Sequence, residues 1–119
     1  MPYNKRNIGT EYEKLAEEYL VKNGVRILEK NFRSRFGEID LIGYDREYLV
    51  FFEVKYRVNE SAGYAEEAVN LKKQRTICKV ADYYRVKHAV SDFAPMRFDV
   101  IAVSGEEIRW IQNAFSYGL

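Results

Sequence analysis

The chain has 119 residues and a formal net charge of +1, so it is large enough for one domain with its own core and shows no overall basic bias. A single cysteine excludes a disulfide framework and a Cys-rich zinc site, and a single histidine excludes a His-based metal site or a Ser-His triad. The sequence has no apolar run of the roughly 18 residues that a membrane span needs and no signal-peptide core, so we expect a cytoplasmic protein without membrane contact.

The N-terminal part of the chain predicts a helix preceded by an arm. Residues 1–7 are polar and basic, and we expect them to be flexible. Apolar residues at helical spacing indicate a helix from about Thr10 to Lys22. Glu13 completes a capping-box pattern with Thr10, in which its carboxylate folds back onto the backbone at the helix start.

Three strands are expected next. The first runs from Val25 to Phe32, and the other two form a hairpin from Glu38 to Gly43 and from Tyr48 to Tyr56. Arg33 and Arg35 lie between the first strand and the hairpin. They either bind phosphate or remain solvated hairpin residues.

Three charged residues interrupt the apolar runs of the hairpin: Asp40 on its first strand, and Glu53 and Lys55 on its second. Side chains alternate faces along a strand, so Glu53 and Lys55 share one face. If residues 45 and 46 form a two-residue turn, Asp40 lies opposite Phe51 and diagonal to Glu53. All three charged side chains then project together, about 7–8 Å apart at the backbone for the two acids.

Two interpretations of this charged group are open. Two carboxylates and an ammonium suit a hard cation such as Mg²⁺ or Mn²⁺, which would polarise a phosphoryl oxygen and lower the pKa of a bound water. Lys55 would then orient that water or neutralise charge on the phosphate. The alternative is a structural salt bridge between Lys55 and either acid.

The second half of the chain predicts a loop, a long helix and two strands. Residues from Val58 to Gly63 have loop chemistry, and a helix is expected from about Ala65 to Lys87. Lys73 falls in line with the apolar stripe of this helix, where it either contacts phosphate or extends to solvent. Strands are expected from Phe98 to Val103 and from Ile108 to Ile111.

The order of these elements predicts an α/β fold. A strand, a long helix and a strand imply a right-handed crossover, so the returning strand should run parallel to the strand of Glu53 or to one near it. We therefore expect an αβββαβ order followed by a terminal strand, with a mixed sheet between helices.

Two motifs carry a resemblance to known families. Asp40, twelve further residues and then Glu53-Val54-Lys55 resemble the PD-(D/E)XK core of restriction-endonuclease-like nucleases, with Ile39 in place of the usual proline. More narrowly, GEIDLI at residues 37–42 and VFFEVKYR at residues 50–57 resemble the YraN-like bacterial family. The resemblance extends from about Gly9 to Phe115.

This resemblance implies a restriction-endonuclease-like fold in a single domain and Mg²⁺-dependent (or Mn²⁺-dependent) hydrolysis of DNA, including branched or damaged DNA. The metal ligands would be Asp40, Glu53 and the backbone carbonyl of Val54, with Lys55 positioning the attacking water. Glu13 resembles the helix glutamate of YraN-like and archaeal Holliday-junction-resolvase-like nucleases, and would assist through water or at a second ion. The residues expected to contact nucleic acid are Lys73, Gln74, Arg33, Arg35 and Arg57.

Two other functions are open at this point. The chain could be a nucleic-acid-binding or assembly module that has the nuclease fold and does not cleave. It could also be a structural interaction protein in which the acidic pair is only a salt-bridge network. A homodimer is compatible with all of these functions.

Overall fold

The computed structural model describes residues 5–56 and 69–118, with side-chain detail from residue 11 onward. Within these residues, the helices and strands follow one another in the predicted order. The elements are α1 (Lys5–Lys22), β1 (Arg26–Ser34), β2 (Gly37–Asp45), β3 (Tyr48–Tyr56), α2 (Leu71–Lys87), β4 (Met96–Ser104) and β5 (Glu107–Phe115).

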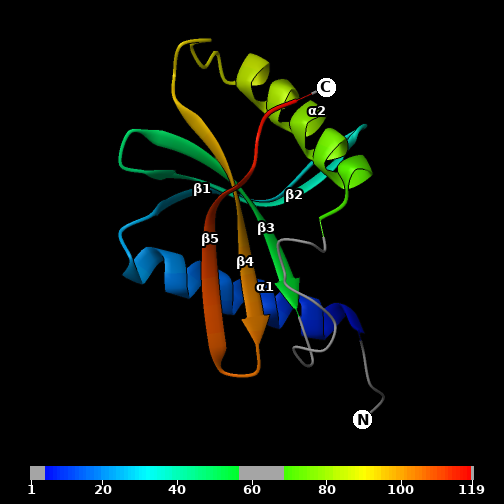
Figure 1. Ribbon diagram of the computed structural model, residues 1–119, viewed down its shortest axis with the longest axis vertical. Helices are drawn as coiled ribbons and strands as arrows, with labels where there is room; N and C mark the ends of the chain where they lie inside the picture. The colour runs from blue at the N-terminus through cyan, green and yellow to red at the C-terminus, as the bar shows by residue number, and fades with distance from the viewer. Residues whose placement is uncertain (1–4, 57–68, 119) are drawn as a thin grey trace.

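The strands form one five-stranded mixed sheet in which their order in space follows their order in the chain. β1, β2 and β3 are antiparallel neighbours, β4 is parallel to β3, and β5 returns antiparallel to β4. The parallel pair β3–β4 is the one that the long connection through α2 joins (Figure 1). The α/β prediction, with β4 parallel to the strand of Glu53, is therefore confirmed.

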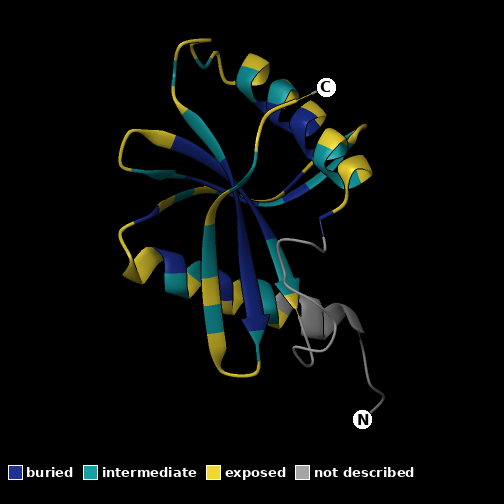
Figure 2. Ribbon diagram, viewed as in Figure 1, coloured by how far each residue is buried: buried dark blue, intermediate teal, exposed yellow. Residues whose placement is uncertain are grey.

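The two helices cover opposite faces of the twisted sheet (Figure 1). Ala16 and Leu20 of α1 belong to one buried cluster, which includes Phe52 of β3. Ile77 and Tyr84 of α2 belong to a second cluster, on the other face. Figure 2 shows the buried residues concentrated in the middle of β3 and β4, where the two clusters lie back to back. No helix in the described ranges is long and apolar enough to cross a membrane.

Several predicted boundaries were wrong. α1 begins at Lys5, so the expected arm is helical over its last residues and Thr10 lies inside the helix. α2 begins at Leu71, because the side chain of Asn70 caps the backbone N–H of Lys73 at 2.8 Å. The predicted loop from Val58 to Gly63 and the expected start of the helix at Ala65 lie outside the described residues.

Gly37 allows α2 to approach the beginning of β2. Its φ of +151° lies outside the range that L side chains commonly adopt, and an added Cβ would lie 2.7 Å from Cγ2 of Thr76. The close approach places the first turns of α2 beside the strand that carries Asp40. This contact helps to bring Lys73 into the site described below.

Candidate active site

Asp40 lies where β2 and β3 separate. The pairing of the two strands ends at Leu41 and Phe52. Asp40 is the residue before Leu41, and its Oδ2 accepts a hydrogen bond of 2.8 Å from the backbone N–H of Val54 in β3. The carboxylate of Asp40 therefore accepts from the N–H of Val54 at the point where the backbone hydrogen bonds between β2 and β3 end.

The two neighbours of Asp40 in β2 pack on opposite faces of the sheet. Leu41 belongs to the cluster under α1 and Ile39 to the cluster under α2. Residues two apart share a face in a regular strand, so β2 rotates at Asp40. The carboxylate of Asp40 thus reaches along the sheet toward β3. We had predicted instead that it projects from the sheet face that carries Glu53 and Lys55.

Glu53 and Lys55 project together from β3, as their alternation predicted. Nζ of Lys55 lies 3.7 Å from Oε1 of Glu53, and Nζ of Lys73 in α2 lies 3.6 Å from the same oxygen. The side chain of Glu53 is only 7% exposed. Lys73 therefore lies at the site, where its contact is with a carboxylate.

The turn between β2 and β3 differs from the predicted one. Its two residues are Arg46 and Glu47, with Asp45 already paired to Tyr48. The predicted pairing of Asp40 with Phe51 was therefore wrong, because Ile42 occupies that position. The turn still has two residues, as predicted, so the register changes by an even number and the side chains do not exchange faces. Glu53 and Lys55 therefore lie on the predicted face.

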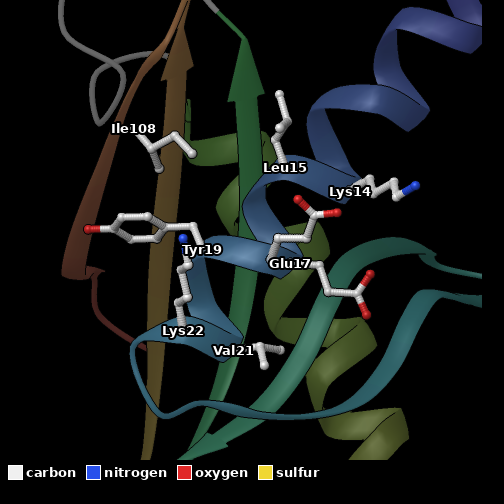
Figure 3. A pocket seen from close by; sticks show the side chains of 8 residues that line it. Lys14, Leu15, Glu17, Tyr19, Val21, Lys22 and Ile108 are labelled. Carbon is white, nitrogen blue, oxygen red and sulfur yellow. The ribbon is translucent and has the colours of Figure 1, made fainter.

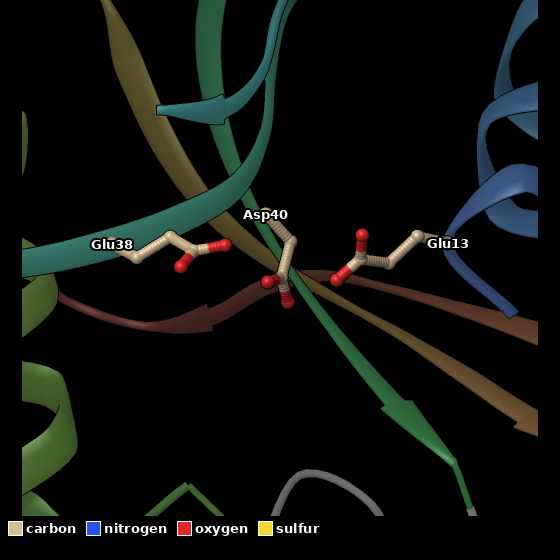
Figure 4. A group of neighbouring side chains, drawn as sticks. All are labelled: Glu13, Glu38 and Asp40. Atoms are coloured by element: carbon tan, nitrogen blue, oxygen red, sulfur yellow. The ribbon is translucent and has the colours of Figure 1, made fainter. Parts of the chain in front are cut away.

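A second group of acids surrounds Asp40. One carboxylate oxygen from each of Glu13, Glu38 and Asp40 lies within 4.8 Å of the others. Figure 4 shows Glu38 and Glu13 on either side of Asp40, with Glu13 reaching in from α1. Glu38 was not among the predicted site residues, although its position two residues before Asp40 in GEIDLI was the available signal.

Asn31 and Arg33 of β1 hold this acidic group in place. In the amide orientation that gives both partners a donor, the side-chain nitrogen of Asn31 donates to Oε1 of Glu38 at 2.9 Å and to Oε2 of Glu13 at 3.0 Å. Nε of Arg33 donates to Oε2 of Glu38 at 3.2 Å. The capping interpretation of Glu13 was wrong, since α1 begins before Thr10 and the carboxylate of Glu13 points to the sheet.

Three acids of the site, Glu13, Asp40 and Glu53, resist ionisation. Burial, followed by the charge of Asp40, raises the pKa of Glu53 to about 7. Burial is also the largest cause that raises the pKa of Asp40, against the hydrogen bond from Val54, which lowers it. The pKa of Glu13 is raised by burial and then by the charge of Asp40. Asp40 therefore couples electrostatically to both of the other acids.

The predicted nucleic-acid contacts have different positions. Gln74 donates from Nε2 to the carbonyl of Val69 at 2.8 Å, so its side chain ties down the chain before α2. The guanidinium of Arg35 lies over the ring of Phe36, at 4.9 Å from its centroid. Arg57 lies outside the described residues.

Two hollows lie along α1. A cavity of about 230 Å³ opens beside the acidic group and is lined by Glu13, Lys14, Glu17, Lys30, Asn31 and Leu41. A wider groove of about 680 Å³ lies between α1 and Ile108 of β5 (Figure 3). Leu15, Tyr19 and Val21 give this groove an apolar lining, and it contains no residue of the acidic group.

The donor set fits a hard divalent cation. The candidate ligands are carboxylate oxygens and one backbone carbonyl oxygen, and Mg²⁺ and Mn²⁺ prefer oxygen to nitrogen or sulfur. Three carboxylates from α1 and β2 come together, and the charge of Asp40 opposes the ionisation of Glu13 and of Glu53 in β3. A cation would relieve this repulsion, so the residues present are suited to hold one.

Comparison with known proteins gives one family and many relatives. The model of a family described as uncharacterised protein family UPF0102 matches residues 12–103. The chain is similar to a UPF0102 protein of Lachnoclostridium phytofermentans, at 46% identity over 97% of this chain and 98% of that protein. UPF0102 proteins of Vibrio parahaemolyticus (46% identity, 98% of each chain) and Fusobacterium nucleatum (43% identity, 92% of each chain) are similar as well.

Proposed function

The chain belongs to the UPF0102 family, and we propose that it is a metal-dependent endonuclease that hydrolyses phosphodiester bonds in DNA. One observation carries the proposal. Asp40 sits at the fork between two strands, and Glu53 and Lys55 come from the strand beside it. The spacing of these residues resembles the PD-(D/E)XK nuclease core, and the effect of the charge of Asp40 on the pKa of Glu53 supports a shared site.

Each side chain has a distinct task in the proposed reaction. Asp40 and Glu53, with the carbonyl of Val54, are the proposed metal ligands. A bound Mg²⁺ or Mn²⁺ supplies Lewis acidity and a water that ionises near neutral pH. Lys55, held beside Glu53 at 3.7 Å, orients the attacking water and offsets negative charge at the phosphate. Glu13 accepts a hydrogen bond from a second water or ligates a second ion.

The surface of α2 supports DNA as the substrate. Three exposed basic residues recur at spacings of three and four, which places them on one line along the helix: Lys72, Arg75 and Lys79. The line begins next to Lys73, which contacts the site. Basic side chains in a line can follow the phosphates of a nucleic acid backbone, and this contact is independent of sequence.

The test compares wild type with Asp40→Asn and Lys55→Met. The substrates are linear, nicked, flapped and four-way DNA, each with Mg²⁺ or with Mn²⁺. We expect cleavage of at least one substrate by wild type and a loss of about 10²–10³-fold in each variant. Asp40→Asn keeps an oxygen that can accept from Val54, which limits structural damage.

Matched controls remove the same groups far from the site. Asp92 has a side chain that is 98% exposed, so Asp92→Asn controls for Asp40→Asn. The exposed Lys22 at the end of α1 gives Lys22→Met as the control for Lys55→Met. Cleavage that persists at the wild-type rate in both site variants would assign the activity to another site or to a contaminant.

One observation favours a second function, that of a nucleic-acid-binding or assembly module that does not cleave. Both lysines of the site already contact Glu53, as in a structural salt-bridge network. Such a module would bind DNA equally well when Asp40 is replaced by Asn and would show no turnover with either metal. Filter binding and the cleavage assay, carried out on the same variants, separate the two functions.

A further inference from the structure

Two ammonium groups meet on a single oxygen of Glu53. Lys55 reaches it from two residues away on the same strand, and Lys73 reaches it from the first turn of α2. Glu53 is almost fully buried, whereas the side chain of Lys73 is 42% exposed and that of Lys55 is 28% exposed. One carboxylate thus has two cationic partners, one of them at the edge of the site.

The charges of the site are close to balance without a metal. Among the described residues, four carboxylates of the site (Glu13, Glu38, Asp40 and Glu53) are accompanied by three cationic side chains that pair with them (Arg33, Lys55 and Lys73), for a net charge of −1 when all are ionised. A bound dication would change the net charge of the site to +1 if every side chain stayed in place. The departure of one cationic side chain would restore neutrality, which is the cheaper arrangement in a partly buried site.

Lys73 is the side chain that can leave. Arg33 pairs with Glu38, which is not a proposed metal ligand, and Lys55 lies on the strand that also carries Glu53. Lys73 crosses from another element and already has solvent on one side. Its backbone N–H is held by Asn70, so the start of the helix stays fixed while the side chain turns outward.

We propose that Lys73 is the resident counter-ion of Glu53 in the metal-free protein and that a divalent cation displaces it. The inference rests on the proposed function, because it takes Glu53 as a ligand of the metal. Lys73 is a positioning residue that keeps the carboxylate neutralised until the cation binds. Once displaced, its ammonium is free at the rim of the site, where a phosphate of DNA would approach.

The proposal predicts that loss of Lys73 strengthens metal binding. A unit charge roughly 6 Å from a dication in a water-like dielectric changes the dissociation constant by about tenfold. We therefore expect Lys73→Met to bind Mn²⁺ about tenfold more tightly than wild type in the absence of DNA. A residue that served only to contact phosphate would leave this constant unchanged.

The experiment is calorimetric titration of Mn²⁺ into full-length protein freed of metal with a chelator. It uses wild type, Lys73→Met, Lys73→Arg and Lys72→Met, with thermal unfolding of each in chelator to confirm folding. Lys72→Met removes the same charge from the neighbouring exposed position of α2. Tighter binding by Lys73→Met alone, with Lys73→Arg and Lys72→Met close to wild type, is the expected result.

Other results overturn the proposal in distinguishable ways. Equal tightening in Lys73→Met and Lys72→Met would show a general effect of net charge, without an exchange at Glu53. Weaker binding by Lys73→Met would show that Lys73 holds Glu53 in position for the metal. If no variant binds Mn²⁺, the metal site of the proposed function fails as well, whereas in the first two cases it stands.

Discussion

The raised pKa of Glu53 predicts an unusual pH dependence of stability. In the unfolded chain this carboxyl ionises near 4.5, and in the folded protein near 7. Between these values the folded state holds a proton that the unfolded chain has lost. The free energy of unfolding of the metal-free protein should therefore fall as the pH rises from about 5 to 8.

The size of this effect follows from the shift. Each pKa unit corresponds to about 1.4 kcal/mol, so a shift from 4.5 to about 7 corresponds to about 3 kcal/mol of lost stability at pH 8. The pKa values of Asp40 and Glu13 are also raised, mainly by burial, and act in the same direction. Stability should be highest in mildly acidic buffer.

Glu53→Gln isolates the contribution of this one carboxyl. Gln resembles the protonated acid, so at pH 5 the variant should match wild type, and at pH 8 it should be more stable by about 3 kcal/mol. Its cost is small, because Lys55 and Lys73 are both partly exposed and can turn to water. Urea unfolding in chelator at several pH values measures these differences.

The control and a second arm complete the test. Glu18 is an exposed carboxylate of α1, and Glu18→Gln should leave the pH profile of wild type unchanged. Mg²⁺ favours the ionised acids, so it should stabilise wild type more at pH 8 than at pH 5.5. A wild-type profile that is flat or rises from pH 5 to 8, or a Glu53→Gln profile with the same slope as wild type, would refute the reasoning.

Three further predictions concern other parts of the molecule. Asp99→Asn removes the buried charge that pairs with Arg97, so urea unfolding should show a loss of about 3 kcal/mol in the free energy of unfolding. A loss below about 1 kcal/mol would show that this ion pair does not stabilise the sheet. Gly37→Ala places a methyl carbon 2.7 Å from Thr76, so thermal unfolding should reveal a loss of about 2 kcal/mol, and an unchanged melting temperature would show that α2 can shift at no cost. The last change replaces the exposed basic line of α2 (Lys72, Arg75 and Lys79) by Gln. The log–log slope of DNA affinity against salt concentration, measured by fluorescence anisotropy, should fall by about 2–3. An unchanged slope would show that the DNA binds elsewhere.

The alternation of side chains along strands and the rules for connections between strands were sufficient to predict the architecture. The two-residue period put Glu53 and Lys55 on one face, and the length of the crossover made β4 parallel to β3. The motifs GEIDLI and VFFEVKYR predicted a YraN-like family, and this level of the resemblance is confirmed. These features depend on local sequence, which is why the sequence alone could predict them.

The details of the site depend on contacts between distant elements. The rotation of β2 at Asp40 arises from packing against both helices, and no periodicity shows it. Glu38 joins the acidic group because Asn31 of β1 bridges it to Glu13 of α1. The partner of Lys73 could not be predicted either, since its apolar neighbours in α2 indicate only that it faces the sheet.

Two buried carboxylates of the sheet show the difference between a structural charge and a ligand. Among the described residues, Glu53 and Asp99 are the buried charged side chains. Asp99 accepts bonds of 2.8 to 3.3 Å from Arg97, Trp110 and the backbone N–H of Asn113, so both of its oxygens are satisfied.

Glu53 has no comparable set of partners in the contacts described for it. Its two ammonium contacts of 3.6 and 3.7 Å are longer than good hydrogen bonds, and both are made to Oε1. A carboxylate buried only for stability would be expected to resemble Asp99, since an unsatisfied buried charge is costly. Under the proposed function, a divalent cation would add the partner that these looser contacts leave room for, and this contrast within one sheet supports the proposal of a metal at Glu53.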